Sequence, residues 1–178
     1  LNCNAMYGGG GFFNVSSFVA EKGKAFGNVA RQGAGLFVAA AHRTDIESFD
    51  FLKNTVVTSS VSQWGLTNKI SSLFRMFIVS PDAAAAAGGG AWILILSKMR
   101  NCSFEDNLAM GASVSISTVG FPKSGAHALG SGMYVLQTSQ NSEMSELLFV
   151  RSSVHCAGAD CIAGGNMFLA STGFKTSI

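Results

Sequence analysis

The stretch that decides the fold is GGGAWILILSKMRNCSFEDNLAM, residues 88–110. Three glycines precede the apolar residues 91–96, and glycine in a strand usually marks a bend or a close approach of two backbones. The apolar run is too short to span a membrane and has the composition of a fully buried strand. An F-x-x-N segment, residues 104–107, follows it. The stretch therefore predicts a bend, a buried strand, and then a second segment that an aromatic residue opens and an asparagine closes.

The glycine-rich bend and the apolar run after it recur along the chain. Five copies start at residues 9, 33, 88, 130 and 164. In the last copy Asn166 stands where the third glycine stood. This fits, because asparagine tolerates the left-handed backbone conformation better than most residues.

A phenylalanine follows the first four of these copies at a fairly steady distance. The four are Phe26, Phe51, Phe104 and Phe149. Phe51 and Phe104 open F-x-x-N segments that end at Asn54 and Asn107, whereas the first copy is compressed to Phe-Gly-Asn and the fourth ends in a serine. Two positions further on, each copy has a small or apolar residue: Ala30, Val56, Ala109 and Val154.

The repeats predict an all-β chain in which parallel strands stack as a β-solenoid. No single unit can bury its apolar face, but stacked copies share a continuous core. We expect residues 36–38, 92–96, 133–136 and 167–169 to pair in parallel, about 4.8 Å apart. Asn54 and Asn107 are expected to form a hydrogen-bonded ladder, and the four phenylalanines an interior column. The alternative is a β-sandwich in which these patterns coincide by chance.

The spacing of the copies predicts a single domain, residues 1–178, with irregular loop insertions at about 57–87 and 112–129. Any helix is expected within these insertions. The five alanines at residues 83–87 are either a low-complexity loop or positions whose side chains are unassigned, and no prediction rests on them. Because the chain opens on Leu-Asn-Cys without a methionine, we interpret it as a fragment of a longer repeat protein.

Residues 88–110 resemble the repeat of the polymorphic outer membrane protein family, in which a G-G-A-[IL] element is paired with F-x-x-N. Those repeats are similar to the pectin-lyase-like group of right-handed parallel β-helices. The resemblance implies a right-handed parallel β-helix and a cell-surface adhesin or extracellular structural protein. Similar repeats occur in large surface proteins of microbial eukaryotes, where N-glycosylation would be expected.

The composition excludes some functional classes. Only 12 % of the residues are charged, about half the usual share, which suits buried or stacked strands better than a helical bundle. A net charge of +2 and the absence of any Lys/Arg cluster longer than two residues argue against nucleic-acid binding. The sequence also contains no apolar run that predicts a membrane span in this segment.

Two N-x-S/T triplets and four cysteines bear on the cellular compartment in which the protein is located. The triplets start at Asn14 and Asn101, and they weakly favour a secreted glycoprotein. In an oxidising environment we expect Cys156 and Cys161 to form a local disulfide, since a four-residue spacer can bend back far enough. Cys3 and Cys102 are left without a predicted pairing.

A search for catalytic or ligand-binding groups finds little. Asp45, Glu47 and Asp50, with Arg43 and His42 just upstream, are the only local acidic group. We interpret this group as a solvated turn before Phe51 rather than a catalytic edge. The histidines are far apart and have no ligand-spaced partner, and no phosphate-binding loop or nucleophile elbow occurs. No catalytic, cofactor-binding or metal site is therefore predicted.

The sequence predicts an extracellular structural or adhesive surface protein that is not an enzyme. A filament or fibril subunit assembled head-to-tail is the sharper form of this hypothesis, because uncapped solenoids stack end to end. The expected partners are copies of the same repeat chain, and possible glycans, with no nucleic acid and no cofactor. One alternative is a polysaccharide lyase, hydrolase or tailspike-like enzyme on a β-helix, and a second is a β-sandwich binding module.

Overall fold

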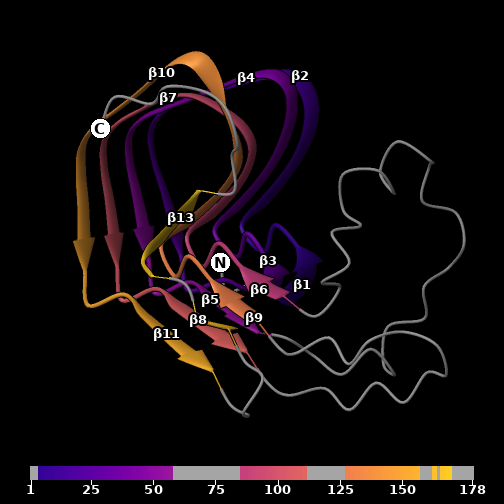
Figure 1. The fold of residues 1–178 in the computed structure, drawn as a ribbon, viewed down its shortest axis with the longest axis vertical. Helices are drawn as coiled ribbons and strands as arrows, with labels where there is room; N and C mark the ends of the chain where they lie inside the picture. Colours follow the sequence, from indigo (N-terminus) through magenta and orange to yellow (C-terminus); the bar gives the residue numbers. More distant parts are fainter. Residues whose placement is uncertain (1–3, 58–84, 112–126, 157–161, 164, 170–178) are drawn as a thin grey trace, which may run out of the picture.

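The computed structural model describes residues 4–57, 85–111, 127–156, 162–163 and 165–169 (Figure 1). In these ranges the chain is all-β and contains no helix. Accordingly, no helix of the described part is long and apolar enough to cross a membrane.

One sheet has five strands in the order β13-β10-β7-β4-β2, and every neighbouring pair is parallel. These strands are β2 (Gly11–Phe26), β4 (Leu36–Leu52), β7 (Ala91–Glu105), β10 (Met133–Val150) and β13 (Met167–Leu169). The first four are long, and Figure 1 shows them bending together into an arch. The predicted parallel stacking is confirmed, because Leu36 pairs with Ala91, Ala91 with Met133, and Met133 with Met167.

The second sheet has eight short strands in the order β11-β8-β5-β3-β6-β9-β12, with β1 also paired to β3. They are β1 (Asn4–Tyr7), β3 (Val29–Gln32), β5 (Thr55–Val57), β6 (Ala85–Ala87), β8 (Leu108–Gly111), β9 (His127–Leu129), β11 (Ser153–Cys156) and β12 (Ile162–Ala163). The pairings described between these strands are parallel as well.

β3 explains where the insertions lie. Its Ala30 pairs with Val56 of β5, and its Gln32 pairs with Ala87 of β6. In each later coil two short strands stand where the first coil has β3 alone. The residues between those two strands, 58–84, 112–126 and 157–161, lie outside the described residues. The strands correct the predicted bounds, because residues 85–87 and 127–129 pair in β6 and β9 rather than belonging to the insertions.

Each long strand and the short strands after it make one coil, and the coils begin at Gly8, Gly33, Gly88 and Gly130. All four glycines have positive φ, between 57° and 70°. A Cβ atom on Gly88 would lie 2.2 Å from the Ala91 carbonyl oxygen, so only glycine fits this corner.

Two further corners of each coil also use the left-handed conformation. One row is formed by Lys22, Ser48, Asn101 and Glu146. The other is formed by Gly27, Lys53, Asp106 and Arg151. Because most of these residues are not glycines, the sequence patterns did not reveal them.

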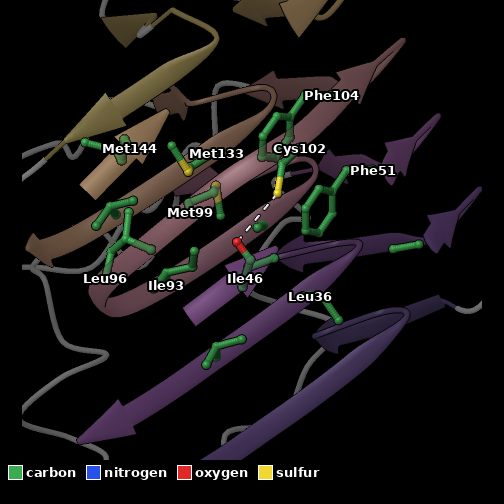
Figure 2. Packing of buried hydrophobic residues seen from close by; sticks show 14 of the residues in the cluster. Leu36, Ile46, Phe51, Ile93, Leu96, Met99, Cys102, Phe104, Met133 and Met144 are labelled. Carbon is green, nitrogen blue, oxygen red and sulfur yellow. Dashed lines mark hydrogen bonds between the residues drawn. The ribbon is translucent and has the colours of Figure 1, made fainter. Parts of the chain in front are cut away.

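The main core lies on the inner face of the long strands. In Figure 2 it is seen as rows of side chains that repeat from coil to coil, such as Ile46 next to Met99. A second, narrower core consists of small residues on the short strands, including Ala30, Val56 and Ala109, with Val154 packed against it. These four residues are the ones that the sequence places two positions after each Asn or Ser.

Candidate functional site

A ladder of asparagines joins the coils at one corner. Asn54 and Asn107 occupy equivalent positions and are fully buried. Asn107 Oδ1 accepts hydrogen bonds from the backbone N–H of Asn54 (3.0 Å) and from its Nδ2 (3.1 Å). Asn107 Nδ2 in turn donates to the Phe51 carbonyl at 2.7 Å. The ladder satisfies backbone groups that the corner would otherwise leave unpaired.

The ladder extends one coil in each direction. Asn28 donates from its backbone N–H and its Nδ2 to Asn54 Oδ1, at 3.2 and 2.9 Å. At the other end Ser152 replaces asparagine, and its Oγ accepts from the Asn107 N–H and donates to the Phe104 carbonyl. The sequence patterns contained Asn28, but the prediction did not include it in the ladder.

Three of the four predicted phenylalanines form an interior column. The rings of Phe51 and Phe104 stack with centroids 4.8 Å apart, and those of Phe104 and Phe149 do the same.

Phe26 does not belong to the interior column, so this part of the prediction is wrong. Ala25 pairs with Phe51, while Phe26 pairs with Leu52 and is 44 % exposed. Side chains alternate along a strand, so an offset of one residue moves the ring to the outer face. There Lys24 Nζ lies 5.6 Å from the centroid of the Phe26 ring.

A second aromatic column on the opposite face of the same strands was not predicted. It runs through Phe12, Phe37, Trp92, Tyr134 and Phe168. Neighbouring rings are stacked and nearly parallel, with interplanar angles of 4–10° and centroid distances of 4.3–6.1 Å. The signal was present in the sequence, because an aromatic residue is the second residue of the apolar run in four copies, and in the first copy Phe12 directly follows the glycines.

The acidic group before Phe51 lies within β4 rather than in a solvated turn, which corrects the sequence interpretation. Asp45 is buried and its Oδ2 accepts from Arg43, which raises the pKa of that guanidinium. Glu47 accepts from Lys98 Nζ at 3.0 Å. Asp50 accepts from the Ser103 hydroxyl. Each carboxylate thus has its own partner, and the three are not arranged around a shared substrate position.

A second charged group lies at the corner beside the asparagine ladder. Arg151 donates to Asp106 Oδ1 at 2.7 Å and also contacts Glu105 on the adjacent coil. The hydrogen bond from Arg151 lowers the pKa of Asp106. These ion pairs are exposed and link two coils, as Lys98 and Glu47 do elsewhere.

Histidine and cysteine do not assemble a metal site in the described residues. His42 and His155 are exposed, and no cluster of three His, Cys, Asp or Glu side chains occurs in this part of the chain. Cys102 is a buried free thiol bonded to backbone carbonyls, and burial raises its pKa. The predicted Cys156–Cys161 disulfide is not tested, because Cys161 lies outside the described residues. Cys3 also lies outside them.

The side chains of both predicted glycosylation asparagines are exposed. Asn14 lies on β2, and Asn101 lies at a left-handed corner, where its Nδ2 donates to Ser48 Oγ at 3.1 Å. Neither asparagine is packed in the core, although Cys102, the middle residue of the second triplet, is buried.

The N-terminal coil contains a cavity of about 680 Å³ at the end of the interior. Phe13, Phe18, Leu36 and Phe49 line it, with Lys24 and Asn28 among the polar residues. Five of the exposed large apolar side chains also lie on this coil: Phe12, Val15, Val19, Phe26 and Val29. Apolar surface gathered in one place marks an interaction site more often than scattered apolar residues do.

No known protein-family model matches the chain, and comparisons with curated proteins and with solved structures found no similar protein.

Proposed function

We propose that this chain is a right-handed parallel β-helix that serves as an extracellular structural or adhesive surface protein and not as an enzyme. Right-handedness is the expected sense, because connections between parallel strands of one sheet are right-handed in about 98 % of cases. The resemblance of residues 88–110 to the repeat of the polymorphic outer membrane protein family favours the same fold and a location at the cell surface.

The observation that carries the proposal is the use of the repeated residues. Asn54, Asn107 and the stacked rings of Phe51 and Phe104 bond one coil to the next instead of converging on a pocket. The carboxylates of the acidic group are likewise paired one by one. A catalytic site for an acidic polysaccharide needs several such groups around one substrate position. The arrangement favours a scaffold, whose function lies in its length and surface.

Incubation of the purified chain with acidic polysaccharides, followed by chromatography of the products, tests this proposal. We expect no shortening of the polymers. Turnover that disappears in Asp45→Asn but persists in Asn14→Gln would replace the proposal with the enzymatic alternative.

The extracellular location needs a separate test. The exposed side chains of Asn14 and Asn101 support it. Expression through a eukaryotic secretory pathway would reveal attached glycans by a mass shift on enzymatic removal. We expect Asn14→Gln and Asn101→Gln each to reduce this mass shift by the mass of one glycan. Secreted protein without any glycan would remove these triplets as support for the extracellular assignment.

A further inference from the structure

The second N-x-S/T triplet, residues 101–103, lies in the interior of a sheet. It belongs to β7, and β4 and β10 pair with β7 on its two sides. Ser103 pairs with Asp50 on one side and with Leu148 on the other. Within the described structure the triplet therefore has no free strand edge.

Every side chain of this triplet contacts a neighbour. Asn101 Nδ2 donates to Ser48 Oγ at 3.1 Å, and the Ser103 hydroxyl donates to Asp50 Oδ1. Cys102 is only 2 % exposed, and its thiol donates to backbone carbonyls. The Asn101 amide thus lies exposed at a corner, while the two residues after it are held by the adjacent coil.

N-glycosylation uses these same groups. The transfer forms a bond between C1 of a sugar and Asn101 Nδ2, and it breaks the bond between that C1 and the phosphate of a lipid pyrophosphate-linked oligosaccharide. The lipid pyrophosphate leaves, and Nδ2 loses one proton. Because the acceptor is an N-x-S/T triplet, the enzyme must reach both the amide and the Ser103 hydroxyl. In the folded sheet that hydroxyl is bonded to Asp50, and a central strand can leave only by breaking hydrogen bonds on both sides.

The folded coil can nevertheless accommodate the product. A carboxamide nitrogen carries two protons, so after transfer Asn101 Nδ2 still has one to donate to Ser48 Oγ. Lys22 and Glu146, which belong to the same corner row, are exposed as Asn101 is. A glycan on Asn101 would therefore lie outside the coil and leave the core unchanged.

We propose that Asn101 accepts a glycan only before β7 pairs with β4 and β10, so that folding of this coil closes the triplet. The fraction of chains with a glycan at Asn101 should then fall when the coil folds faster. This inference rests on the proposed extracellular function, and it adds the stage of folding at which the modification occurs.

The Asn14→Gln variant isolates the site, because Asn101 then begins the only N-x-S/T triplet in the sequence. The purified, folded variant is incubated with solubilised oligosaccharyltransferase and a lipid pyrophosphate-linked oligosaccharide, and mass spectrometry measures the glycan at Asn101. We expect none on the folded chain. The same variant synthesised in the presence of membranes that contain the enzyme should carry the glycan, since the enzyme then meets an unpaired β7.

A variant that cannot fold is the matched control for the purified enzyme. Phe104→Asp places an unpaired charge in the interior column, which should prevent the coil from forming. Combined with Asn14→Gln, it should accept the glycan even after synthesis is complete. Far-UV circular dichroism checks that this control is unfolded. Should it fold, Met99→Asp replaces it, because Met99 is fully buried in the same core.

Two results would overturn this inference. Equal glycan on the folded chain and on the unfolded control would show that strand pairing does not close the triplet. Absence of the glycan from both the unfolded control and the newly synthesised chain would show that Asn101 is not an acceptor. The first result would leave the proposed function intact, whereas secreted protein without a glycan on either asparagine would remove the support for an extracellular location.

Discussion

Single side chains in this protein act mainly on the neighbouring coils. Asn107 bonds to Asn54 and to the Phe51 carbonyl, and Phe104 lies between two stacked rings. Loss of either side chain leaves unpaired polar groups or an empty space that the adjacent coils cannot easily fill.

Asn107→Ala should lower the free energy of unfolding by roughly 1–3 kcal/mol, because it leaves buried hydrogen-bonding groups on two coils without partners. Urea denaturation followed by circular dichroism measures this change. Asn14→Ala is the control, since Asn14 is exposed on β2 and should change stability little. Equal midpoints for the two variants would show that the buried ladder contributes nothing.

Phe104→Ala should cost about 3–5 kcal/mol, as expected for a large buried side chain whose cavity only partly collapses. Phe26→Ala should stay within about 0.5 kcal/mol, because its ring lies on the outer face. The same denaturation experiment compares the two. A larger loss for Phe26→Ala than for Phe104→Ala would contradict the observed register.

Cys102 offers a chemical test of the same core. Its thiol is buried and its pKa is raised, so it should resist alkylation in the folded protein and react once denaturant unfolds the chain. Peptide mapping by mass spectrometry identifies the labelled cysteine. Fast labelling of Cys102 under native conditions would mean that this part of the core opens readily.

At the scale of elements, the corners define the coil. The glycine corner can accept no side chain, whereas the other two corners hold Lys, Ser, Asn, Glu, Asp and Arg residues in the left-handed conformation. Such residues cost stability unless the surrounding structure holds them in place. The inter-coil hydrogen bonds of Asn101 and of Asp106 supply part of that restraint.

Gly88→Ala should destabilise the protein by about 1–3 kcal/mol, because it forces a Cβ atom into a left-handed corner. Gly165→Ala is a matched control, since a Cβ atom there would meet nothing within 4 Å. Thermal unfolding of the two variants measures the difference. Equal melting temperatures would show that the corner adjusts without cost.

The ion pair of Asp106 and Arg151 should make stability depend on acid pH. The folded pKa of Asp106 lies below its ordinary value of 3.8, so the pair stabilises the fold above that pH and loses its effect as the pH falls through the folded pKa. Asp106→Asn keeps a residue that tolerates the left-handed corner. The stability difference between the two proteins should therefore shrink below pH 3.8, whereas a constant difference from pH 7 to pH 2 would contradict this assignment.

How well the sequence predicts equivalent positions in the coils depends on the residue from which positions are counted. The glycine bends and apolar runs correctly predicted parallel stacking. Counting from the phenylalanines misplaced Phe26, because the compressed first copy shortens the interval before Asn28. Counting back three residues from Asn28, Asn54 and Asn107 gives Ala25, Phe51 and Phe104, which are the true equivalents.

Other features could not be predicted because they depend on tertiary structure. The long strands bend through corners formed by ordinary polar residues such as Lys22 and Ser48, for which the sequence carries no glycine signal. The acidic stretch around Asp45 has the composition of a turn, but pairing with neighbouring strands holds it in β4. The outer aromatic column was readable from the sequence, and its regular position in every copy is a signal for similar repeats.

At the scale of the whole molecule, the parallel coils are joined by an outer aromatic column, an asparagine ladder and, in three of the coils, an interior column of phenylalanines. The structural or adhesive role proposed above rests on this arrangement, in which the repeated residues bond one coil to the next.

The parallel register of the coils is the central claim, and nuclear Overhauser contacts in assigned NMR spectra test it most directly. At the start of the long strands we expect contacts of Leu36 with Ala91 and of Ala91 with Met133. At their far ends we expect contacts between the rings of Phe51 and Phe104, and of Phe104 and Phe149. Contacts that instead join Leu36 to the region of Phe104 would mean antiparallel pairing and would contradict the account.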